Sequence, residues 1–454
     1  MKLSVVILAA GLGKRMHSDL PKVLHLLADK PLIRHVVQAA QTLEPESLHI
    51  IYGHQGEQVR EALADVEVNW VEQAQQLGTG HAVAQVMPYL DDETMVLVLN
   101  GDVPLLTPAT LQALYSQADA NSLGVLTAEL DNPQGYGRVV RNDRGQVERI
   151  VEEKDADLNI KSIKEVNAGI YIVSALNLRR WLAQLNNNNA QGEYYLTDII
   201  ALAVQEKQPL YTHTTGNVYE VMGINDRLQL ATLERYYQSQ QVNRLMLTGV
   251  TVRDSARLDI RGTVQTGRDV SIDVNVILEG DVTLGHRVKI GPHTVIRNAQ
   301  IGDDVEISSH CVIDGVIIGA NCRIGPFARL RPETVLAEQV HIGNFVEIKK
   351  STVANGSKIN HLSYIGDSEV GHDVNIGAGT ITCNYDGANK HKTVIGDNAF
   401  IGSDTQLVAP VTVGTGATIG AGSTITRDTK PEALTLSRTS QKTVLGWKRP
   451  KKGS

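Results

Sequence analysis

An aliphatic residue returns at about every sixth position between Ile272 and Ile425. The series is Ile272, Leu278, Leu284, Ile290, Ile296, Ile301, Ile307, Ile313, Ile318, Ile324, Leu330, Leu336, Ile342 and Ile348, then after two short interruptions Ile395, Ile401, Leu407, Val413, Ile419 and Ile425. A period of six fits neither the 3.6-residue turn of a helix nor the two-residue alternation of a strand. The pattern therefore predicts a repeated unit of a short strand and a turn, with three units to a coil.

Such a repeat stacks one aliphatic side chain of each unit on its counterparts in the coils above and below. Burying an Ile or Leu contributes about 1.5–3 kcal/mol, so the stacked residues of this series can together offset the entropy of ordering a narrow prism. Gly, Asn and Asp accept the positive φ that the corners require. The pattern resembles the hexapeptide-repeat transferases, which implies a left-handed parallel β-helix; the handedness rests on this resemblance, since ordinary crossovers are right-handed.

The composition is that of a soluble protein with several domains. A length of 454 residues favours two to four domains, and a net charge of -7 gives no indication of nucleic-acid binding. The sequence has no apolar run of about 18 residues, and the apolar segment 4–10 lacks a signal-peptide cleavage pattern. Cys311, Cys322 and Cys383 form no CxxC pair, which favours reduced thiols. We therefore expect a cytoplasmic protein without a transmembrane segment.

Near the N-terminus a β-branched run, 4–8, leads into a glycine-rich basic loop, 9–16. Small residues let backbone N–H groups approach a phosphate, and Lys14 and Arg15 add positive charge. No third glycine follows Gly11 and Gly13, so the loop matches neither the dinucleotide fingerprint nor the P-loop. By itself, the loop could also be a tight turn.

The loop together with Pro21-Lys22 completes the pattern LxAAGxGxRM…PK, which resembles the sugar-nucleotide pyrophosphorylases. The resemblance implies a Rossmann-like α/β domain over residues 1–226, with uridine selected by Gln73, Gly78 and Thr79. It implies that UTP and the sugar nucleotide are bound by Leu8, Ala9, Ala10, Gly11, Lys22, Gln73, Gly78, Thr79, Asn100, Gly101, Asp102, Gly137, Glu152, Asn167 and Asn225. For His81, packing under the base-reading loop is favoured over a catalytic role.

Asp102 follows the buried strand pattern 96–99, at the sheet edge where α/β proteins gather ligands. A carboxylate there is a candidate Mg²⁺ ligand, and the resemblance pairs it with Asn225. Arg15 and Lys22 would act on the phosphates. The attacking phosphate oxygen is already ionised, so the chemistry needs alignment and charge neutralisation rather than a general base. Asn100 stands where close relatives carry an aromatic residue, which leaves its contact open.

Residues 227–250 predict one long connecting helix, with Leu230, Leu233 and Tyr237 on an amphipathic stripe. The repeat domain then covers residues 251–454. Its end, from Lys430 onward, is basic. A solvated tail is the simpler interpretation, and contact with coenzyme A phosphates is the alternative.

Within the repeats, polar residues gather at 323–331, 347–350, 360–364 and 375–390. With these segments the whole chain resembles the bifunctional N-acetylglucosamine-1-phosphate uridyltransferases and glucosamine-1-phosphate acetyltransferases. The resemblance makes His361 the general base, oriented or tuned by Glu347. It assigns Arg331, Lys349, Tyr364 and Asn375 to glucosamine 1-phosphate. It assigns Ala378, Asn384, Tyr385, Ser403, Ala421 and Arg438 to acetyl-CoA and the reaction site, with Ser403 a possible oxyanion donor.

The expected function is acetylation of glucosamine 1-phosphate by acetyl-CoA, followed by transfer of UMP from UTP to the product. The result would be UDP-N-acetylglucosamine, a precursor of peptidoglycan and lipopolysaccharide. The resemblance also implies a homotrimer. Two alternatives stay open: a pyrophosphorylase whose repeats only assemble or regulate, and a non-catalytic interaction protein. The first is disfavoured by the set Arg331, Lys349, His361, Tyr364 and Asn384. The second is disfavoured by Arg15, Lys22 and Asp102.

Overall fold

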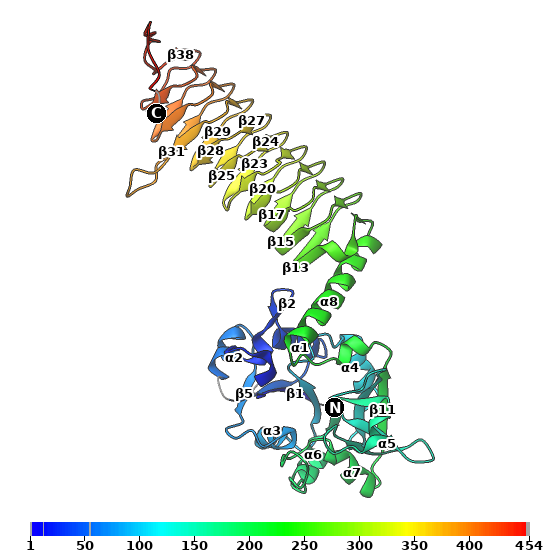
Figure 1. Cartoon of the computed structure of the whole chain (residues 1–454). Helices are drawn as coiled ribbons and strands as arrows, with labels where there is room; N and C mark the ends of the chain where they lie inside the picture. The colour runs from blue at the N-terminus through cyan, green and yellow to red at the C-terminus, as the bar shows by residue number, and fades with distance from the viewer. Residues whose placement is uncertain (1, 12, 54–55, 451–454) are drawn as a thin grey trace. The chain divides into compact units, whose positions relative to one another are not determined.

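The computed structural model describes residues 2–11, 13–53 and 56–450. Contacts divide the chain into two compact units, Met1–Tyr237 and Gln238–Ser454. The boundary falls within helix α8, Arg227–Leu247 (Figure 1). Leu233 packs in the first unit with Met16, Leu27 and Leu32, whereas Val242 and Leu245 belong to the core of the second.

The first unit is a mixed sheet in the order β11-β7-β10-β6-β1-β4-β5, with β8 and β9 added beside β10. Its strands are β1 Leu3–Ala9, β4 Ser47–Tyr52, β5 Asn69–Glu72, β6 Met95–Asn100, β7 Leu123–Glu129, β8 Arg138–Arg141, β9 Val147–Val151, β10 Glu165–Ser174 and β11 Leu210–Thr215. β2 Leu26–Leu27 and β3 Lys30–Pro31 form a separate small hairpin. β1 runs parallel to β4 and β6, while β10 is antiparallel to β6 and β7.

Helices cover both faces of this sheet. They are α1 Leu32–Gln41, α2 Gly56–Ala62, α3 Thr79–Val86, α4 Pro108–Tyr115, α5 Leu158–Lys161, α6 Ala175–Leu182 and α7 Asp198–Gln205. One core contains side chains of α1, α2 and α4, and the other contains those of α3, α6 and α7. Because the central strands are buried on both faces, β1 and β6 are apolar at every position except Ser4 and Asn100, rather than alternating.

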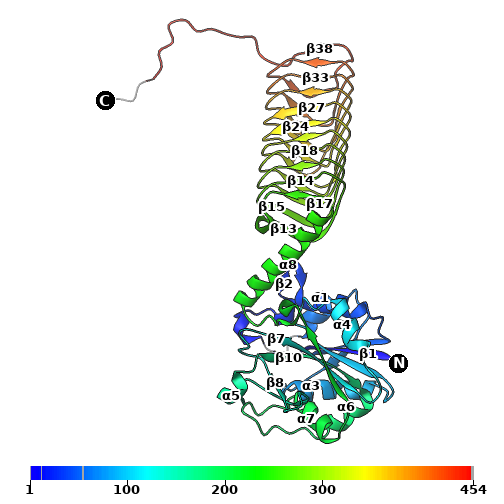
Figure 2. The same ribbon diagram turned by 90° about the vertical axis from the view of Figure 1, so that its right-hand side faces the viewer.

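The second unit is a parallel β-helix, in which short strands stack coil upon coil (Figure 2). One face holds β12 Thr251–Val252, β14 Ser271–Ile272, β16 Lys289–Ile290, β18 Glu306–Ile307, β21 Arg323–Ile324, β24 His341–Asn344, β27 Lys358–His361, β30 Asn375–Ile376, β33 Phe400–Ile401, β36 Thr418–Ile419 and β38 Leu434–Thr435. The long strands β13 Leu258–Thr266, β15 Val276–Leu284 and β17 Val295–Ile301 begin the other two faces.

After β17 these two faces separate. The first continues as β19 Val312–Asp314, β22 Arg329–Leu330, β25 Glu347–Lys349, β28 Tyr364–Gly366, β31 Ile381–Cys383, β34 Gln406–Val408 and β37 Thr424–Ile425. The second continues as β20 Val316–Ile318, β23 Thr334–Leu336, β26 Thr352–Val353, β29 Ser368–Val370, β32 Thr393–Ile395 and β35 Val411–Val413. The predicted parallel β-helix of short strands is therefore confirmed.

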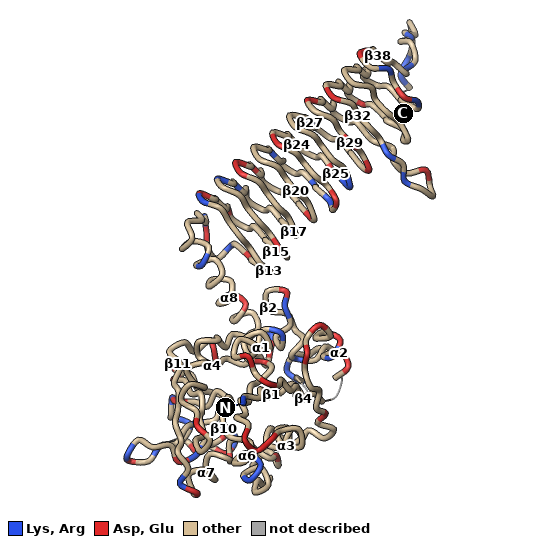
Figure 3. The backbone as a smooth tube through the Cα atoms, turned by 180° about the vertical axis from the view of Figure 1, so that it is seen from behind, with Lys and Arg blue, Asp and Glu red and all other residues tan. Residues whose placement is uncertain are grey.

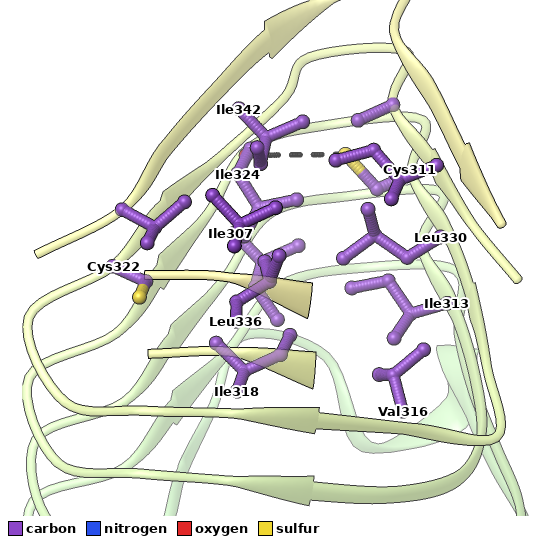
Figure 4. Close-up of a cluster of buried hydrophobic side chains, with 14 of the residues drawn as sticks. Ile307, Cys311, Ile313, Val316, Ile318, Cys322, Ile324, Leu330, Leu336 and Ile342 are labelled. Carbon is purple, nitrogen blue, oxygen red and sulfur yellow. Dashed lines mark hydrogen bonds between the residues drawn. The ribbon is translucent and has the colours of Figure 1, made fainter. Parts of the chain in front are cut away.

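Every residue of the predicted aliphatic series lies inside the prism and is at most 3% exposed. Figure 4 shows part of this column, with Ile307, Ile324 and Ile342 from successive coils among the labelled side chains. Cys311 and Cys322 are buried in the same column, and burial raises the pKa of each thiol to about 11. All three cysteines are free.

Of the two predicted interruptions between Ile348 and Ile395, the first is wrong, and the second is confirmed as an inserted loop. Val353, Ile359, Ile365, Val370 and Ile376 continue the buried column between Ile348 and Ile395. Thr382 takes the next position, also buried, where its hydroxyl bonds Gly366 O at 3.2 Å. The six-residue count fails here because some steps are five residues long and one position carries a hydroxyl in place of an aliphatic group.

A true insertion lies in the loop after β31. Coils are usually 17 or 18 residues apart, as in Ile342 to Ile359 and Ile359 to Ile376, but Ile376 pairs with Ile401. The extra residues form a loop that projects from the coils (Figure 1).

One corner of the prism carries large side chains at positive φ. His293, His310, Phe327 and Phe345 stack on one another, with ring centroids 4.8 to 5.3 Å apart. The expected Gly, Asn and Asp are therefore not the only corner residues, because stacking supplies contacts that offset the unfavourable backbone conformation.

Basic and acidic residues are interspersed along the backbone of both units (Figure 3). Among the described helices none has the length and apolarity needed to cross a membrane.

Candidate functional sites

Two adjoining cavities, of about 350 and 690 Å³, open at the carboxyl ends of β1 and β6. Thr79, Asn100 and Asp102 line both. The smaller cavity is also lined by the predicted residues Leu8, Ala9, Ala10, Gly11, Lys22, Gln73 and Gly78. The larger is also lined by Arg15, Gly137, Glu152, Asn167 and Asn225. Residues far apart in the sequence thus meet at one sheet edge.

Gly101 is the one predicted binding residue of this unit that is not among the lining residues of either cavity. It is buried, and a Cβ there would lie 3.0 Å from Leu8 O. Its backbone N–H bonds the same oxygen at 2.9 Å. Gly101 therefore serves the close packing of β6 against β1.

The glycine-rich loop approaches Lys22 closely. Gly13 has φ 58°, and a Cβ at this position would lie 2.8 Å from Lys22 Cβ. A side chain here would therefore be strained and would collide with Lys22. Leu12, within the same motif, lies outside the described residues.

The Lys22 ammonium donates to Asp102 Oδ2 and to Asn225 Oδ1, the latter at 3.1 Å. One carboxylate oxygen and one amide oxygen therefore converge on a position already held by a cation. Hard oxygen donors of this kind suit Mg²⁺, so the residues fit the expected metal. Among the described residues no group of three His, Cys, Asp or Glu side chains could hold a metal ion, so the remaining ligands of Mg²⁺ would come from water and phosphate.

Glu152, which also lines the larger cavity, is held by Thr197, whose hydroxyl donates to Glu152 Oε1 at 3.1 Å. Burial raises the pKa of this carboxyl, opposed by the Thr197 hydrogen bond. Asn167 Nδ2 donates to the Tyr171 hydroxyl at 2.6 Å, and Asn167 Oδ1 accepts from Gly169 N at 2.9 Å. The sequence analysis did not identify Thr197 and Tyr171 as supports.

Asn100 has the contact that the sequence left open. Its Nδ2 lies 3.2 Å from Gly169 O and 3.4 Å from Ala168 O. A Cβ at Gly169 would lie 2.4 Å from that nitrogen, so the glycine leaves room for the amide. Asn100 thus ties the end of β6 to β10 at the junction of the two cavities.

In the second unit, His361 ends β27 on the exposed surface of the prism. Its Nδ1 lies 3.1 Å from Oδ1 of Asn344, its register partner on β24. The sequence had pointed to Glu347 as the orienting residue, but Glu347 bonds Arg331 at 2.8 Å and lies 3.9 Å from Arg329. The reason is topological: β24 and β27 share one face, whereas Glu347 lies on β25 of another.

A second polar cluster lies beside β25 and β28. Asn384 donates to Asp367 Oδ2 and lies 3.5 Å from the Tyr364 hydroxyl. The neighbouring Lys390 ammonium lowers the pKa of Lys349. The inserted loop therefore brings Lys390 to Lys349, which is 41 positions earlier in the chain. The sequence did not identify Lys390, Asp367 or Asn344 as residues of this site. For two of them a signal was available, because Asn344 and His361, like Asp367 and Asn384, are separated by the 17 residues of one coil.

The remaining predicted residues follow one another up the coils. Asn375 lies on β30, in register with Phe400 on β33. Ala378 O accepts from Asp404 N at 2.7 Å, Ser403 O from Gly422 N at 2.8 Å, and Ala421 O from Arg438 Nη1 at 2.6 Å. Tyr385 is 61% exposed in the inserted loop, where its hydroxyl bonds Gly387 O at 2.6 Å. Lys451 and Lys452 of the basic tail lie outside the described residues.

Comparison with known proteins gives three family matches. Residues 5–214 match the MobA-like NTP transferase domain, residues 260–346 the GMPPB C-terminal domain, and residues 392–427 the bacterial transferase hexapeptide family with six repeats.

One similar solved structure is a nucleotidyl transferase from Methanothermobacter thermautotroptrophicus. It has 20% identity and a TM-score of 0.39, and the match covers 52% of this chain and 97% of that one. A likeness at this level carries no argument about function. The family matches do, and the chain is a transferase that joins a nucleotidyltransferase-type α/β domain to hexapeptide repeats of the acyltransferase type.

Proposed function

We propose that the protein carries two activities at two sites: acetylation of glucosamine 1-phosphate in the β-helix, and uridylyl transfer to N-acetylglucosamine 1-phosphate in the α/β domain. The observation that carries the proposal is the presence of two separate polar clusters, one around Asp102 and one around His361, in units with their own cores.

For uridylyl transfer, a phosphate oxygen of the sugar phosphate attacks the α-phosphorus of UTP, and pyrophosphate leaves with the bridging oxygen. Lys22 and Arg15 line the adjoining cavities and would neutralise the phosphates. Asp102 and Asn225 would hold Mg²⁺, which supplies Lewis-acid stabilisation of phosphate charge when bound. Glu152 and Asn167, which line the larger cavity, would hold the sugar.

For acetyl transfer, the glucosamine nitrogen attacks the thioester carbonyl and the coenzyme A sulfur leaves as thiolate. The amide oxygen Asn344 Oδ1 can only accept a hydrogen bond, so His361 Nδ1 carries the proton in this contact. The lone pair of Nε2 is then free to take the proton of the attacking nitrogen. Lys349, Lys390 and Arg331 supply positive charge for the sugar phosphate, and Ser403 is a candidate oxyanion donor.

A homotrimer would complete the second site. In one chain, His361 is exposed, and Ala378, Ser403 and Ala421 follow the corner from coil to coil. A neighbouring prism in a threefold assembly would cover such a row and enclose a cofactor. The competing hypothesis, a pyrophosphorylase whose repeats only assemble the protein, gives no role to the His361–Asn344 pair.

The test uses two variants of the full chain with glucosamine 1-phosphate, acetyl-CoA, UTP and Mg²⁺. His361→Ala should abolish release of free coenzyme A, while pyrophosphate release from added N-acetylglucosamine 1-phosphate persists. Asp102→Ala should do the converse. A wild-type protein that releases pyrophosphate but never coenzyme A would leave the single-activity alternative standing.

A further inference from the structure

The amide of Gln73 is held from inside the protein by two acceptors. Gln73 follows β5 and is only 3% exposed. Its Nε2 lies 3.1 Å from Gly78 O and 3.0 Å from Nδ1 of His81. A carbonyl oxygen can only accept, so the amide nitrogen must be the atom that faces Gly78. With both N–H groups directed inward, Oε1 is the polar atom that Gln73 can offer to a ligand in the smaller cavity.

The same geometry determines the proton position on His81. Nδ1 must accept from Gln73, so in the neutral ring the proton is on Nε2. The Gln85 amide nitrogen lies 3.3 Å from that Nε2 and 3.0 Å from His81 O. The bond to His81 O needs only one N–H of the Gln85 amide, and the contact of that amide with Nε2 is the longer of the two at the ring. The Gln73 side therefore determines the tautomer.

We propose that His81 is a positioning residue for nucleobase selection, which acts by keeping Gln73 an acceptor towards the base. The proposal rests on the proposed uridylyl transfer at this site. Uracil presents an N3–H donor, whereas cytosine presents an N3 acceptor at the same place. An acceptor held in one orientation pairs with uracil and opposes cytosine, and a site built on such a polar contact discriminates more strongly than one built on shape.

His81 also packs near the segment that contains Tyr194, since the two ring centroids lie 6.5 Å apart. That segment lies close to Gly78 as well: Gly78 has φ 114°, and a Cβ on Gly78 would lie 2.6 Å from Tyr194 O. A purely structural role would therefore weaken binding of every nucleotide when His81 is replaced. The positioning role makes a different prediction. Loss of Nδ1 removes one of the two acceptors that hold the Gln73 amide nitrogen inward, so that the amide can turn, at the cost of the Gly78 contact alone, and donate an N–H to cytosine.

The experiment measures UTP and CTP affinity by calorimetry, with Mg²⁺ and without sugar phosphate, on the full chain. In His81→Ala the ratio of UTP to CTP affinity should fall by roughly three- to tenfold, the equivalent of one hydrogen bond between neutral groups. His81→Asn, whose Oδ1 can accept in place of Nδ1, should retain the wild-type ratio. Gln85→Ala, which removes the other contact of the ring, should retain it too.

His81→Leu, which has no acceptor but a comparable volume, carries the test if the alanine variant does not fold. The proposal is overturned if both non-accepting variants lose affinity for UTP and CTP by the same factor, or if His81→Asn loses the ratio as they do. A wild-type protein that binds UTP and CTP equally would overturn the uridine preference of the proposed function itself.

Discussion

The ammonium of Lys22 is paired with the carboxylate of Asp102, and the two side chains are only 14% and 19% exposed. The same ammonium lies 3.1 Å from Asn225 Oδ1. Lys22 therefore holds the position where the proposed metal ligands converge. A divalent cation bound to these oxygens would displace the ammonium, which would then be free for the phosphates.

Lys22→Ala should raise the affinity for a divalent cation in the absence of nucleotide. The expected gain is roughly tenfold, because a charge-assisted hydrogen bond that competes for the carboxylate is worth about 1.5–3 kcal/mol. Mn²⁺ binding followed by electron paramagnetic resonance measures this directly. Arg15→Ala is the control, because it also removes a positive charge that lines the larger cavity. The hydrogen bond that the structure shows to Asp102 comes from Lys22, so Arg15→Ala should change the affinity for Mn²⁺ less than Lys22→Ala does. Weaker Mn²⁺ binding in Lys22→Ala would contradict the displacement.

Leu336→Ala should destabilise the β-helix by about 2–5 kcal/mol, the usual cost of a large-to-small change in a packed core. Leu336 is 1% exposed inside the column, whereas its neighbour Val335 points outward and is 38% exposed. Val335→Ala is therefore the matched control, with an expected change under about 1 kcal/mol. Denaturant unfolding of the full chain followed by far-ultraviolet circular dichroism compares them. An equal loss in the free energy of unfolding for both variants would mean that the buried aliphatic column does not stabilise the β-helix more than its exposed side chains do.

Glu152→Gln should stabilise the α/β domain at neutral pH. Burial raises the pKa of Glu152, so the folded protein binds this proton more tightly than the unfolded chain does. The ionised carboxyl therefore destabilises the fold above the folded pKa, and the penalty is absent at low pH, where both states are protonated. The thermal midpoint of Glu152→Gln should exceed that of the wild type at pH 7–8, and the difference should vanish near about pH 4.

Glu153→Gln is the control of opposite sign. Burial acts to raise the pKa of Glu153, but its ion pair with Arg138, at 2.7 Å, prevails and the pKa is lowered. Its ionised form stabilises the fold at neutral pH, and that contribution is lost as pH falls through the lowered pKa. Glu153→Gln should therefore lower the thermal midpoint at pH 7. The same sign of effect in both variants would contradict the assignment.

Asn344→Ala should lower kcat for acetyl transfer by roughly ten- to a hundredfold, a part of what a positioned general base supplies. Without Asn344 Oδ1 the His361 ring can turn and carry its proton on either nitrogen. Asn344→Asp keeps an acceptor and should retain more of the rate. Uridylyl transfer measured on the same samples should be unchanged, and a fall in both activities would point to a folding defect instead.

The periodicity of the repeats predicted the column and the loop inserted after β31, but it also predicted an interruption after Ile348 that the fold does not contain. Val353, Val370 and Thr382 occupy interior positions that break either the spacing or the hydrophobic pattern. The structure tolerates the shortened spacing and the polar residue, because the hydrogen bonds between stacked coils set the register of the strands. A turn shortened by one residue leaves those bonds intact, and so does the Thr382 hydroxyl, which is hydrogen-bonded to Gly366 O.

The site residues divide in the same way. The pattern from Gly11 to Lys22 and the strand before Asp102 identified the ends of β1 and β6 as a binding edge, and the cavities lie there. Sequence reasoning could not find Thr197 behind Glu152, or Asn344 rather than Glu347 beside His361. The Asn344–His361 pair depends on β24 and β27 sharing one face of the prism. The Thr197–Glu152 pair depends on where α7, which Thr197 directly precedes, packs on the sheet.

The sequence by itself determined the two architectures, because a six-residue period and a buried strand ending in a glycine-rich basic loop are local patterns that few folds accommodate. The tertiary structure alone decided the partners: Lys22 with Asp102, His81 with Gln73, Lys390 with Lys349. The physical reason is that a hydrogen bond or a charge interaction depends on distance in space, and separations of 8 to 80 positions along the chain become contacts only after strands and coils have found their register.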